Sequence, residues 1–409
     1  MAADAAELLR RCDELAAISE DAEGLTRRFA TPELAAASAL VAEWMREAGL
    51  QTRVDPVGNV VGRLEGSDPR ARTLLIGSHL DTVRDAGRYD GPLGVLAGIA
   101  LAQRLTGRLP FALEVLGLAD EEGLRYRTPY LGSRVVAGSF RAEDLDRADS
   151  DGIVMRDAIV SAGGDPTAFA AEARRPESLL GYVELHIEQG PVLESLDASV
   201  GIVSAIAGRT RARLELIGRA GHAGTVPMAL RRDPLVVAAR IVERVDAIAR
   251  AADGLVATVG ELTVEPGAAN VIPGRVTLSI DLRGPDDDAR LQAWETIADR
   301  INRLAQEGGV DARALELEHT PAVACDPRLR ALLAAAARAR SVEAPLLTSG
   351  AGHDAVILAV IAPVAMLFVR SPGGISHHPD ESVREQDVAV ALDVLEEFVR
   401  ALALAEGAR

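Results

Sequence analysis

The chain has 409 residues, of which 48% are hydrophobic and only 3% aromatic, and its formal net charge is −17 at pH 7. At about 150 residues per domain this length predicts two domains, or three, with a core of Ala, Leu and Val side chains. The negative charge argues against a nucleic-acid or membrane-surface partner, because either one requires a basic surface on the protein.

The basic and sulfur-containing residues restrict the chemistry further. All 44 basic residues are arginine, which excludes a P-loop lysine, a Schiff-base lysine, a Ser–Lys dyad and a carbamylated lysine between two metals. Cys12 and Cys325 stand far apart in the sequence. Neither a disulfide framework nor a thiolate metal site is therefore expected.

No targeting or membrane-spanning segment is expected. The first residues alternate charge with Ala and Leu at helical spacing and lack the apolar region of a signal peptide. The longest apolar stretch, 355–369, contains Pro363 and falls short of the roughly 20 residues that a spanning helix needs. Together with the cysteine usage, these features predict a cytoplasmic protein.

The first part of the chain alternates helices with apolar strands. After an N-terminal helix, a second helix is predicted to begin after Thr31. Thr31 is its N-cap, the following proline takes the first helical position, and Gly49 marks the end of the helix. Extended segments follow at 51–64, 73–81 and 111–120, and a helix is predicted at 94–107. Apolar strands separated by helices indicate a largely buried α/β sheet.

A different pattern begins near Thr210. The predicted order is strand, helix, strand, strand, helix, strand, over 210–218, 233–252, 255–264, 275–284, 287–306 and 312–319. This βαββαβ order is ferredoxin-like, and the polar–apolar alternation of its strands predicts one sheet face covered by the two helices. We predict a catalytic domain formed by 1–209 and 321–409, interrupted by an inserted domain at 210–320.

Histidine and carboxylate residues gather where these strands end. His79 and Asp81 lie two apart at the end of strand 73–81, so both side chains point the same way. His79 is a candidate metal ligand whose other ring N–H donates to Asp81, or equally a buried histidine satisfied by its neighbour. Asp90 lies in a glycine-rich loop before a helix, where a carboxylate can bridge two metals or cap the helix.

Two adjacent glutamates, Glu121 and Glu122, follow strand 111–120. Each raises the pKa of the other unless cations lie nearby. One can bind a metal while the other takes a proton from the attacking water, which is what amide hydrolysis requires; the alternative is a solvated turn.

The remaining candidates lie on a later strand and a C-terminal loop. His186 is a candidate ligand on a strand that runs into a Gly-Pro turn, where Gln189 can hydrogen-bond a ureido or amide group. His377 and His378 lie in a loop that can place one of them over a preformed site.

These motifs occur in the order GSHLDTV, GRYDGPLG, DEEG, HIEQGPVLE, GRAGHAGTVPM, AANVIPG, SGAGHDA and GISHHPDE. From about residue 55 to 385 the chain resembles the hydantoinase/carbamoylase family of di-metal amidohydrolases. The combination of HIEQGPVLE with HAGT and SHxPxE is highly specific. The resemblance implies an α/β fold: a mixed-sheet catalytic domain of the zinc aminopeptidase/carboxypeptidase type with an inserted ferredoxin-like α+β domain.

The resemblance also implies roles for individual residues. One divalent ion would be bound by His79, Asp90 and His186, and the other by Asp90, Glu122 and His377, with Zn or Mn, or Co, as the metal. Glu121 would be the general base, and Asp81 would orient His79. The implied substrate contacts are His222, which polarises the scissile carbonyl from the partner subunit of a homodimer, together with Asn270, Arg283, Arg211 and Gln189.

The implied activity is hydrolysis of the ureido C–N bond of a small carboxylated substrate, an N-carbamoyl-L-amino acid or allantoate, with 3-ureidopropionate also open. Arg283 would bind the substrate carboxylate. His353 is expected beside the site, and His319 is expected to be structural. Ala86, Leu124 and Val226 depart from the family pattern, and the last two put substrate choice in doubt.

Two alternatives remain open. One is an N-acyl amino acid hydrolase or dipeptidase of the same clan, although His186 takes a position that is usually acidic in those relatives. The other is a non-catalytic binding homologue, which the retention of every expected ligand and of Glu121 argues against.

Overall fold

The computed structural model describes residues 2–68, 70–105 and 109–407. The chain forms two compact units. The first comprises Met1–Ser204, Cys325–Leu347 and Ala351–Arg409, and the second comprises Ala205–Ala324 with Thr348–Gly350. The second unit thus begins and ends a few residues outside the segment 210–320 marked from the sequence. The predicted fold class, a mixed α/β protein, is confirmed.

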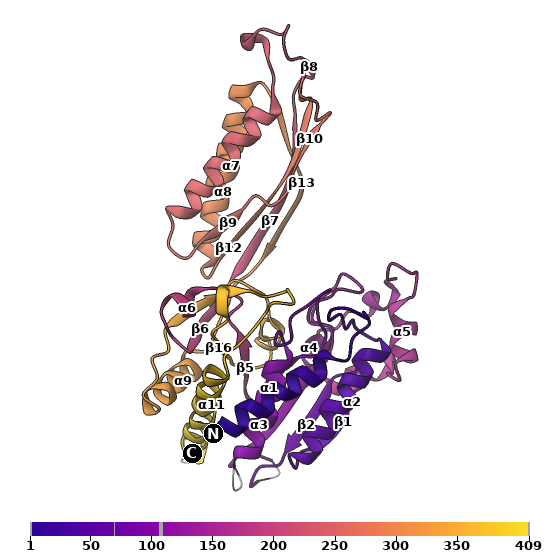
Figure 1. Ribbon diagram of the computed structural model, residues 1–409, viewed down its shortest axis with the longest axis vertical. Coiled ribbons are helices and arrows are strands. Elements are labelled where there is room, and N and C mark those ends of the chain that lie inside the picture. The colour runs from indigo at the N-terminus through magenta and orange to yellow at the C-terminus, as the bar shows by residue number, and fades with distance from the viewer. Residues whose placement is uncertain (1, 69, 106–108, 408–409) are drawn as a thin grey trace. The chain divides into compact units, whose positions relative to one another are not determined.

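The first unit is built on a mixed sheet with strand order β1-β2-β4-β3-β5-β16-β6 (Figure 1). Its strands are β1 (Gln51–Val54), β2 (Val60–Leu64), β3 (Thr73–His79), β4 (Ala112–Leu118), β5 (Leu179–Ile187), β6 (Val200–Ile206) and β16 (Val364–Val369). β14 (Val323–Ala324) and β15 (Leu346–Ser349) also pair with β6. Strand β3 pairs in parallel with β4 and β5, and β16 pairs in parallel with β5.

The parallel strands are buried along their whole length, because helices cover them. All residues of β3, β4, β5 and β16 are buried. Helix α3 (Pro92–Arg104) packs on β3, β4 and β5, while α2 (Pro32–Glu47) packs on β1 and β2. Since parallel strands end at the same edge of a sheet, residues that follow β3, β4, β5 and β16 are brought together there.

The longer predicted elements of this unit are present. Thr31 caps α2 and accepts a hydrogen bond from the Leu34 N–H at 3.3 Å. Helix α3 begins before the predicted 94–107 and ends at Arg104; residues 106 and 107 lie outside the described residues. The extended segment 51–64 is a hairpin of β1 and β2, with a turn in which the Asp55 carboxylate accepts three backbone N–H groups.

Shorter helices of this unit escaped the sequence pattern. They are α4 (Leu131–Val136), η1 (Ala142–Asp146), α5 (Met155–Ser161), η2 (Pro166–Glu172), η3 (Pro176–Ser178), α6 (Val192–Ser195), α10 (Ala355–Leu358) and η5 (Pro372–Gly374). The long helices of the unit, besides α2 and α3, are α1 (Ala2–Ala16), α9 (Pro327–Ala339) and α11 (Glu385–Gly407). Most of these short helices span under two turns, which is too short for a helical period to show in the sequence.

The second unit has the predicted βαββαβ order. Its elements are β7 (Gly208–Ile217), β8 (Gly221–His222), η4 (Met228–Leu230), α7 (Pro234–Arg250), β9 (Val256–Thr258), β10 (Leu262–Glu265), β11 (Val271–Ile272), β12 (Arg275–Gly284), α8 (Asp287–Gly308) and β13 (Asp311–Thr320). The antiparallel sheet has the order β10-β12-β7-β13, which is ferredoxin-like. The predicted strand 255–264 is interrupted, so β9 and β10 pair separately with β12.

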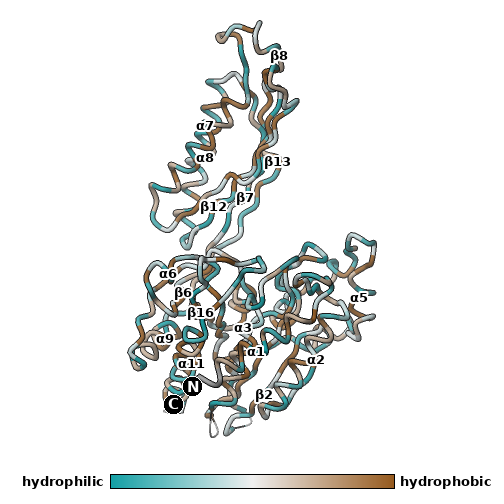
Figure 2. The backbone as a smooth tube through the Cα atoms, viewed as in Figure 1, coloured by the Kyte–Doolittle hydropathy of each residue, from teal (hydrophilic) through white to brown (hydrophobic). Residues whose placement is uncertain are grey.

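One face of this second sheet is covered by α7 and α8 (Figure 1). Buried and more exposed residues alternate along β7 and β12. Figure 2 colours the same strands by hydropathy and shows both hydrophobic and hydrophilic stretches in this sheet. Val276, Leu278, Ile280 and Leu282 form the buried row of β12. Among the described residues, no helix is both long and apolar enough to cross a membrane.

Candidate metal centre

The carboxyl edge of the first unit's sheet collects the acidic and imidazole side chains. His79 ends β3, Glu121 and Glu122 follow β4, and His186 lies near the end of β5. Asp90 lies in the loop before α3, and His377 lies in the loop after η5. The structure therefore brings together the five residues proposed as ligands, and Glu121 lies beside them with His79 and Glu122.

The loop of Asp90 approaches His79 closely only because Gly91 follows it. Gly91 has φ +86°, and a Cβ atom there would lie 2.6 Å from the His79 ring. Any side chain at this position would push the two loops apart. The glycine thus allows Asp90 to reach the imidazoles.

Asp90 lies between two sets of side chains. Its Oδ1 is 3.1 Å from His186 Nε2 and 3.5 Å from His79 Nε2. Its Oδ2 is 3.1 Å from His377 Nε2, which in turn is 3.5 Å from Glu122 Oε1. Each oxygen of the carboxylate thus faces a different group of potential ligand atoms, which is the arrangement of a bridging carboxylate.

The tautomer of His186 provides a direct test of whether a cation fits. His186 Nδ1 lies 2.9 Å from the Ile187 carbonyl oxygen, so Nδ1 carries the proton that it donates there. In the neutral ring Nε2 then presents a lone pair; it is buried and has no hydrogen-bond partner among the described residues, although Asp90 Oδ1 is 3.1 Å away. A lone pair facing a carboxylate oxygen in a buried site is unfavourable without a cation between them.

The donor set also suits a divalent ion. Imidazole nitrogens and carboxylate oxygens without thiolates are the ligands typical of Zn²⁺, Mn²⁺ or Co²⁺ sites in proteins. Within the groups His79–Asp90–His186 and Asp90–Glu122–His377, one atom of each residue lies within 4.8 Å of the others. The residues present therefore fit two ions that share Asp90.

Asp81 holds the site in a different way from the one expected. The predicted acceptor for the His79 ring N–H was the Asp81 carboxylate, but the nearest acceptor is the Asp81 backbone oxygen at 3.0 Å, and the carboxylate is 3.6 Å away. The carboxylate instead accepts the backbone N–H groups of Glu121 at 2.9 Å and Glu122 at 3.1 Å. It has these donors within reach because β3 and β4 are neighbours and the chain turns directly after both.

The two glutamates lie in an environment that favours their protonated forms. Burial raises the pKa of Glu121 well above its usual value, with the neighbouring Glu122 adding to the shift. Burial, and then the charge of Asp90, raises the pKa of Glu122 to about 7. A hydrogen bond to Asp90 raises the pKa of His377 to about 9. In the absence of an ion, these groups retain protons that a metal must displace.

This competition predicts that metal affinity rises with pH. Glu122 with a pKa of about 7 and His377 with a pKa of about 9 must each lose a proton to bind an ion. Below pH 7 both groups are protonated, so affinity for the ion that they share should rise by up to about 100-fold per pH unit; between pH 7 and 9 Glu122 is ionised while His377 is still protonated, and the rise for that ion should be about tenfold. Chelator competition at several pH values measures this slope, and a pH-independent affinity would contradict it.

Further residues of the site were not found from the sequence, or were given a different contact. Gln189 was predicted to bind substrate; its Nε2 donates to Asp90 Oδ2 at 3.0 Å and to Ser376 Oγ at 3.0 Å. Ser376 and Glu381 also reach the Asp90 loop and were missed. The final glutamate of SHHPDE was the only sign of Glu381. His353, expected beside the site, is buried with its ring centroid 4.5 Å from that of His186.

The predicted substrate residues of the second unit form two groups. His222 and Asn270 lie together at the two-stranded antiparallel sheet of β8 and β11, where the Asn270 carbonyl accepts the Ala223 N–H. Arg283 and Arg211 both approach Asp281 on the sheet, at 2.7 Å and 3.5 Å. His319, predicted to be structural, lies 2.9 Å from Thr210 Oγ1 through its Nδ1.

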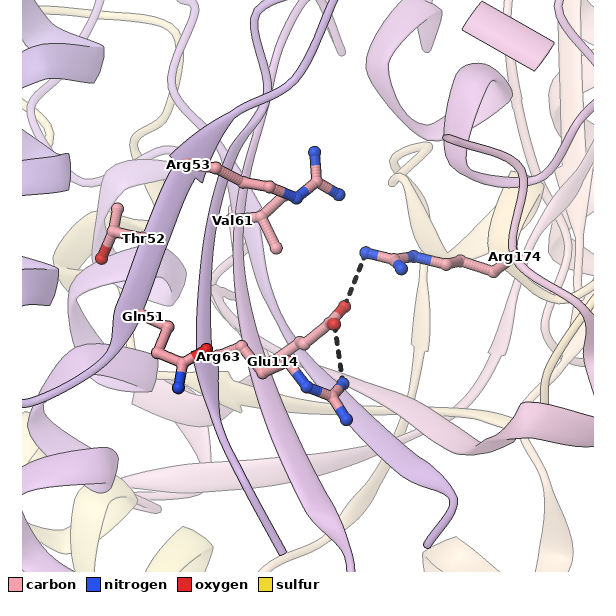
Figure 3. Close-up of a pocket in the computed structure, with 7 residues that line it drawn as sticks. All are labelled: Gln51, Thr52, Arg53, Val61, Arg63, Glu114 and Arg174. Carbon is pink, nitrogen blue, oxygen red and sulfur yellow. Dashed lines mark hydrogen bonds and ion pairs between the residues drawn. The ribbon is translucent and has the colours of Figure 1, made fainter. Parts of the chain in front are cut away.

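A separate cavity of about 450 Å³ lies on the face of β1, β2 and β4 (Figure 3). Arg63 and Arg174 both donate to the buried Glu114 there, each at 2.9 Å. Arg53 also points into this space, and its Nη2 lies 2.7 Å from Glu172. The cavity is lined by no histidine and its arginines are paired with carboxylates, so it has the character of a structural ion-pair network and not of a reaction site.

Comparison with known proteins agrees with this class of site, a metal-dependent hydrolase centre on an α/β sheet. Residues 75–401 match the model of peptidase family M20/M25/M40, and the chain belongs to that family. It is 42% identical to an N-carbamoyl-L-amino acid amidohydrolase of Geobacillus stearothermophilus, over 98% of both chains. It is 41% identical to a probable allantoate deiminase of Oryza sativa subsp. japonica, over 96% of this chain and 87% of that protein.

Among solved structures, the chain is similar to an amidase of the hydantoinase/carbamoylase family from Burkholderia multivorans. The TM-score is 0.92 and the sequence identity 33%, over 98% of both chains. The resemblance drawn from the motifs is confirmed by these relatives.

Proposed function

We propose that the protein is a metal-dependent amidohydrolase that cleaves the ureido C–N bond of an N-carbamoyl-L-amino acid or of allantoate, releasing ammonia and carbon dioxide. The observation that carries the proposal is the position of Asp90, whose two carboxylate oxygens face separate imidazole sets. Full-length relatives named for these two ureido substrates support it.

The chemistry divides among the residues of the first unit. His79, Asp90 and His186 would hold one divalent ion, and Asp90, Glu122 and His377 the other. When bound, such ions acidify the attacking water and polarise the ureido carbonyl. Glu121 takes the proton of that water and returns it to the leaving nitrogen, which departs as ammonia. The remaining carbamate loses carbon dioxide.

Asp81 serves this proton transfer indirectly. By accepting the backbone N–H groups of Glu121 and Glu122, it fixes the turn that carries both glutamates. The base and the ligand are thereby held at a constant separation from His79. Such preorganisation is required because a proton is transferred only within hydrogen-bond reach.

The second unit is proposed to supply substrate contacts. His222 would polarise the scissile carbonyl, Asn270 would hydrogen-bond the substrate, and Arg283 would bind its carboxylate, with Arg211 and Gln189 as further contacts. Asp281 accepts Arg283 Nε at 2.7 Å and Nη2 at 3.1 Å, which fixes the plane of the guanidinium. A fixed guanidinium plane favours recognition of a planar carboxylate.

Replacing Arg283 by Gln is expected to raise KM for a carboxylated ureido substrate by about 10- to 100-fold with a smaller change in kcat, because a charge-assisted hydrogen bond is worth about 1.5–3 kcal/mol. Steady-state kinetics measures the split. Arg250→Gln, on the exposed surface of α7 beside Asp246, is the matched control. An unchanged KM would remove Arg283 from the substrate contacts.

Oligomeric state, location and metal identity are part of the proposal. We propose a cytoplasmic homodimer that acts on a small carboxylated molecule, and not on nucleic acid or membranes, with two Zn²⁺ or Mn²⁺ ions per subunit, or Co²⁺. The role of His222 requires the dimer, because it enters the site of the partner. Sedimentation of the active enzyme tests this, and full activity as a monomer would reject it.

The substrate is tested with ammonia release from metal-loaded protein against allantoate, N-carbamoyl-L-amino acids and 3-ureidopropionate. N-acetyl amino acids and dipeptides, followed by amine release, form the second arm, since the family is also named for peptidases. Turnover confined to a ureido compound supports the proposal. Cleavage confined to the second arm would assign an N-acyl amino acid hydrolase or dipeptidase, and no turnover in either arm would favour a non-catalytic homologue.

A further inference from the structure

We propose that Ser376 and Glu381, acting with Gln189, position Asp90 for only one of the two ions, the one held by Glu122 and His377. This inference rests on the proposed di-metal function. The three residues are called the Asp90 clamp below. They are positioning residues, because each acts through Asp90 and none is among the proposed ligands.

The clamp is a closed set of hydrogen bonds around one carboxylate oxygen. Gln189 Nε2 donates to Asp90 Oδ2 at 3.0 Å, and Ser376 Oγ lies 3.3 Å from the same oxygen. Gln189 Nε2 also lies 3.0 Å from Ser376 Oγ. The serine hydroxyl thus accepts from the amide and has a single proton to give, either to Asp90 or to Glu381.

Glu381 joins the loop of Asp90 to the loop of His377. Its Oε1 accepts the backbone N–H groups of Tyr89 at 2.9 Å and Asp90 at 3.1 Å, and its Oε2 lies 3.1 Å from Ser376 Oγ. Glu381 is 4% exposed, so these donors replace the water that a carboxylate would otherwise bind. One side chain therefore fixes the backbone of the bridging ligand and the residue next to His377.

The chain makes room for this carboxylate by having glycine opposite it. A Cβ atom on Gly87 would lie 2.3 Å from Glu381 Cβ, Cδ and Oε1. The Asp90 loop consequently runs directly against the glutamate. The contact is close enough that the side chain cannot shift without moving the loop.

The selectivity follows from which oxygen the clamp holds. Within the described part of the chain, the hydrogen bonds from Gln189 and Ser376 to Asp90 end at Oδ2, which faces His377 Nε2 at 3.1 Å. Oδ1 faces His79 and His186 instead. Ser376 also precedes His377, which has a left-handed backbone with φ +55° that the neighbouring contacts must maintain. Loss of the clamp should therefore loosen the site of His377 and spare the other.

The test measures both binding constants by titrating metal-stripped protein with Mn²⁺ and with Co²⁺ under chelator competition. Ser376→Ala and Glu381→Gln are each expected to weaken one ion by about 10- to 100-fold, the range typical of residues that orient ligands, and to leave the other within about twofold. The Co²⁺ absorption spectrum should change for the weakened ion alone. Ser376→Thr keeps the hydroxyl and should restore wild-type affinity.

Matched controls are Ser161→Ala at the end of α5 and Glu177→Gln in η3, both exposed and outside the elements that carry the clamp. Because Ser376 and Glu381 are joined by a hydrogen bond, the double variant should weaken ion binding by less than the product of the two single-variant factors. Equal weakening of both ions, unchanged affinity in both variants, or failure of Ser376→Thr to restore binding would overturn the proposal. Wild-type protein that binds fewer than two ions would instead defeat the di-metal function itself.

Discussion

Glu121→Gln is expected to lower kcat by about 10³-fold, within the 10²- to 10⁴-fold range typical of general-base catalysis, and to leave the content of bound metal unchanged. The amide keeps the size of the side chain but cannot accept the proton of the attacking water. Burial raises the pKa of Glu121 well above its usual value, so its carboxylate binds a proton more strongly than an exposed glutamate does. KM should change little, because the substrate contacts are proposed elsewhere.

The neighbouring Glu122→Gln provides the matched comparison. Glu122 Oε1 lies 3.5 Å from His377 Nε2 and belongs to the proposed second ligand set. This variant should lose one bound ion, whereas Glu121→Gln should retain both. Stopped-time ammonia assays and metal analysis of the same preparations separate the two roles. Loss of metal in Glu121→Gln, or near-normal kcat, would contradict the assignment of Glu121 as the base.

Asp90→Ala is expected to weaken both ions by more than the 10- to 100-fold that loss of an orienting residue costs, and to abolish measurable turnover. Asp90 is the only residue shared by the two ligand sets of the described structure. Its removal leaves His79 and His186 on one side and Glu122 and His377 on the other, with no carboxylate between them. Metal analysis after dialysis measures the loss.

The contrasting control for Asp90 is His377→Ala, which removes a ligand from one set only. It should retain the ion held with His79 and His186. Near-ultraviolet circular dichroism verifies that both variants keep their tertiary structure. Retention of two ions by Asp90→Ala would show that Asp90 is not a bridging ligand.

The fold was predictable where the sequence pattern is local and long. Thr31 with a following proline, the apolar runs that became β3 and β4, and the alternation in β12 each predict one element from a local pattern. The short helices between 131 and 178 were missed because so few residues show no period. The interruption between β9 and β10 was missed because the residues on both sides favour strands.

The clustering of the candidate ligands was predictable because strand ends and glycine loops concentrate polar residues at one sheet edge. The hydrogen bonds within this cluster could not be predicted, since they depend on loops that lie far apart in sequence. Asp81 was expected to hold His79 through its carboxylate and instead holds the backbone of two glutamates. Gln189 and His377 adopt left-handed backbones, with φ +58° and +55°, which residue type does not favour and therefore does not reveal.

The proposed role of the second unit depends on a partner subunit, so contacts within one chain do not test it. His222 is exposed on the two-stranded sheet of β8 and β11 and Asn270 lies beside it, so the structure keeps these two together. Their action on a substrate stays a proposal. Leu124 and Val226 depart from the family pattern, and their effect on substrate choice stays untested.

The most direct test of the di-metal amidohydrolase account is ammonia release from a ureido substrate by metal-stripped protein titrated with Mn²⁺. The account predicts no turnover at the start and a rise that reaches its plateau at two equivalents per chain. Full activity in the stripped protein, or a plateau at one equivalent, would contradict it.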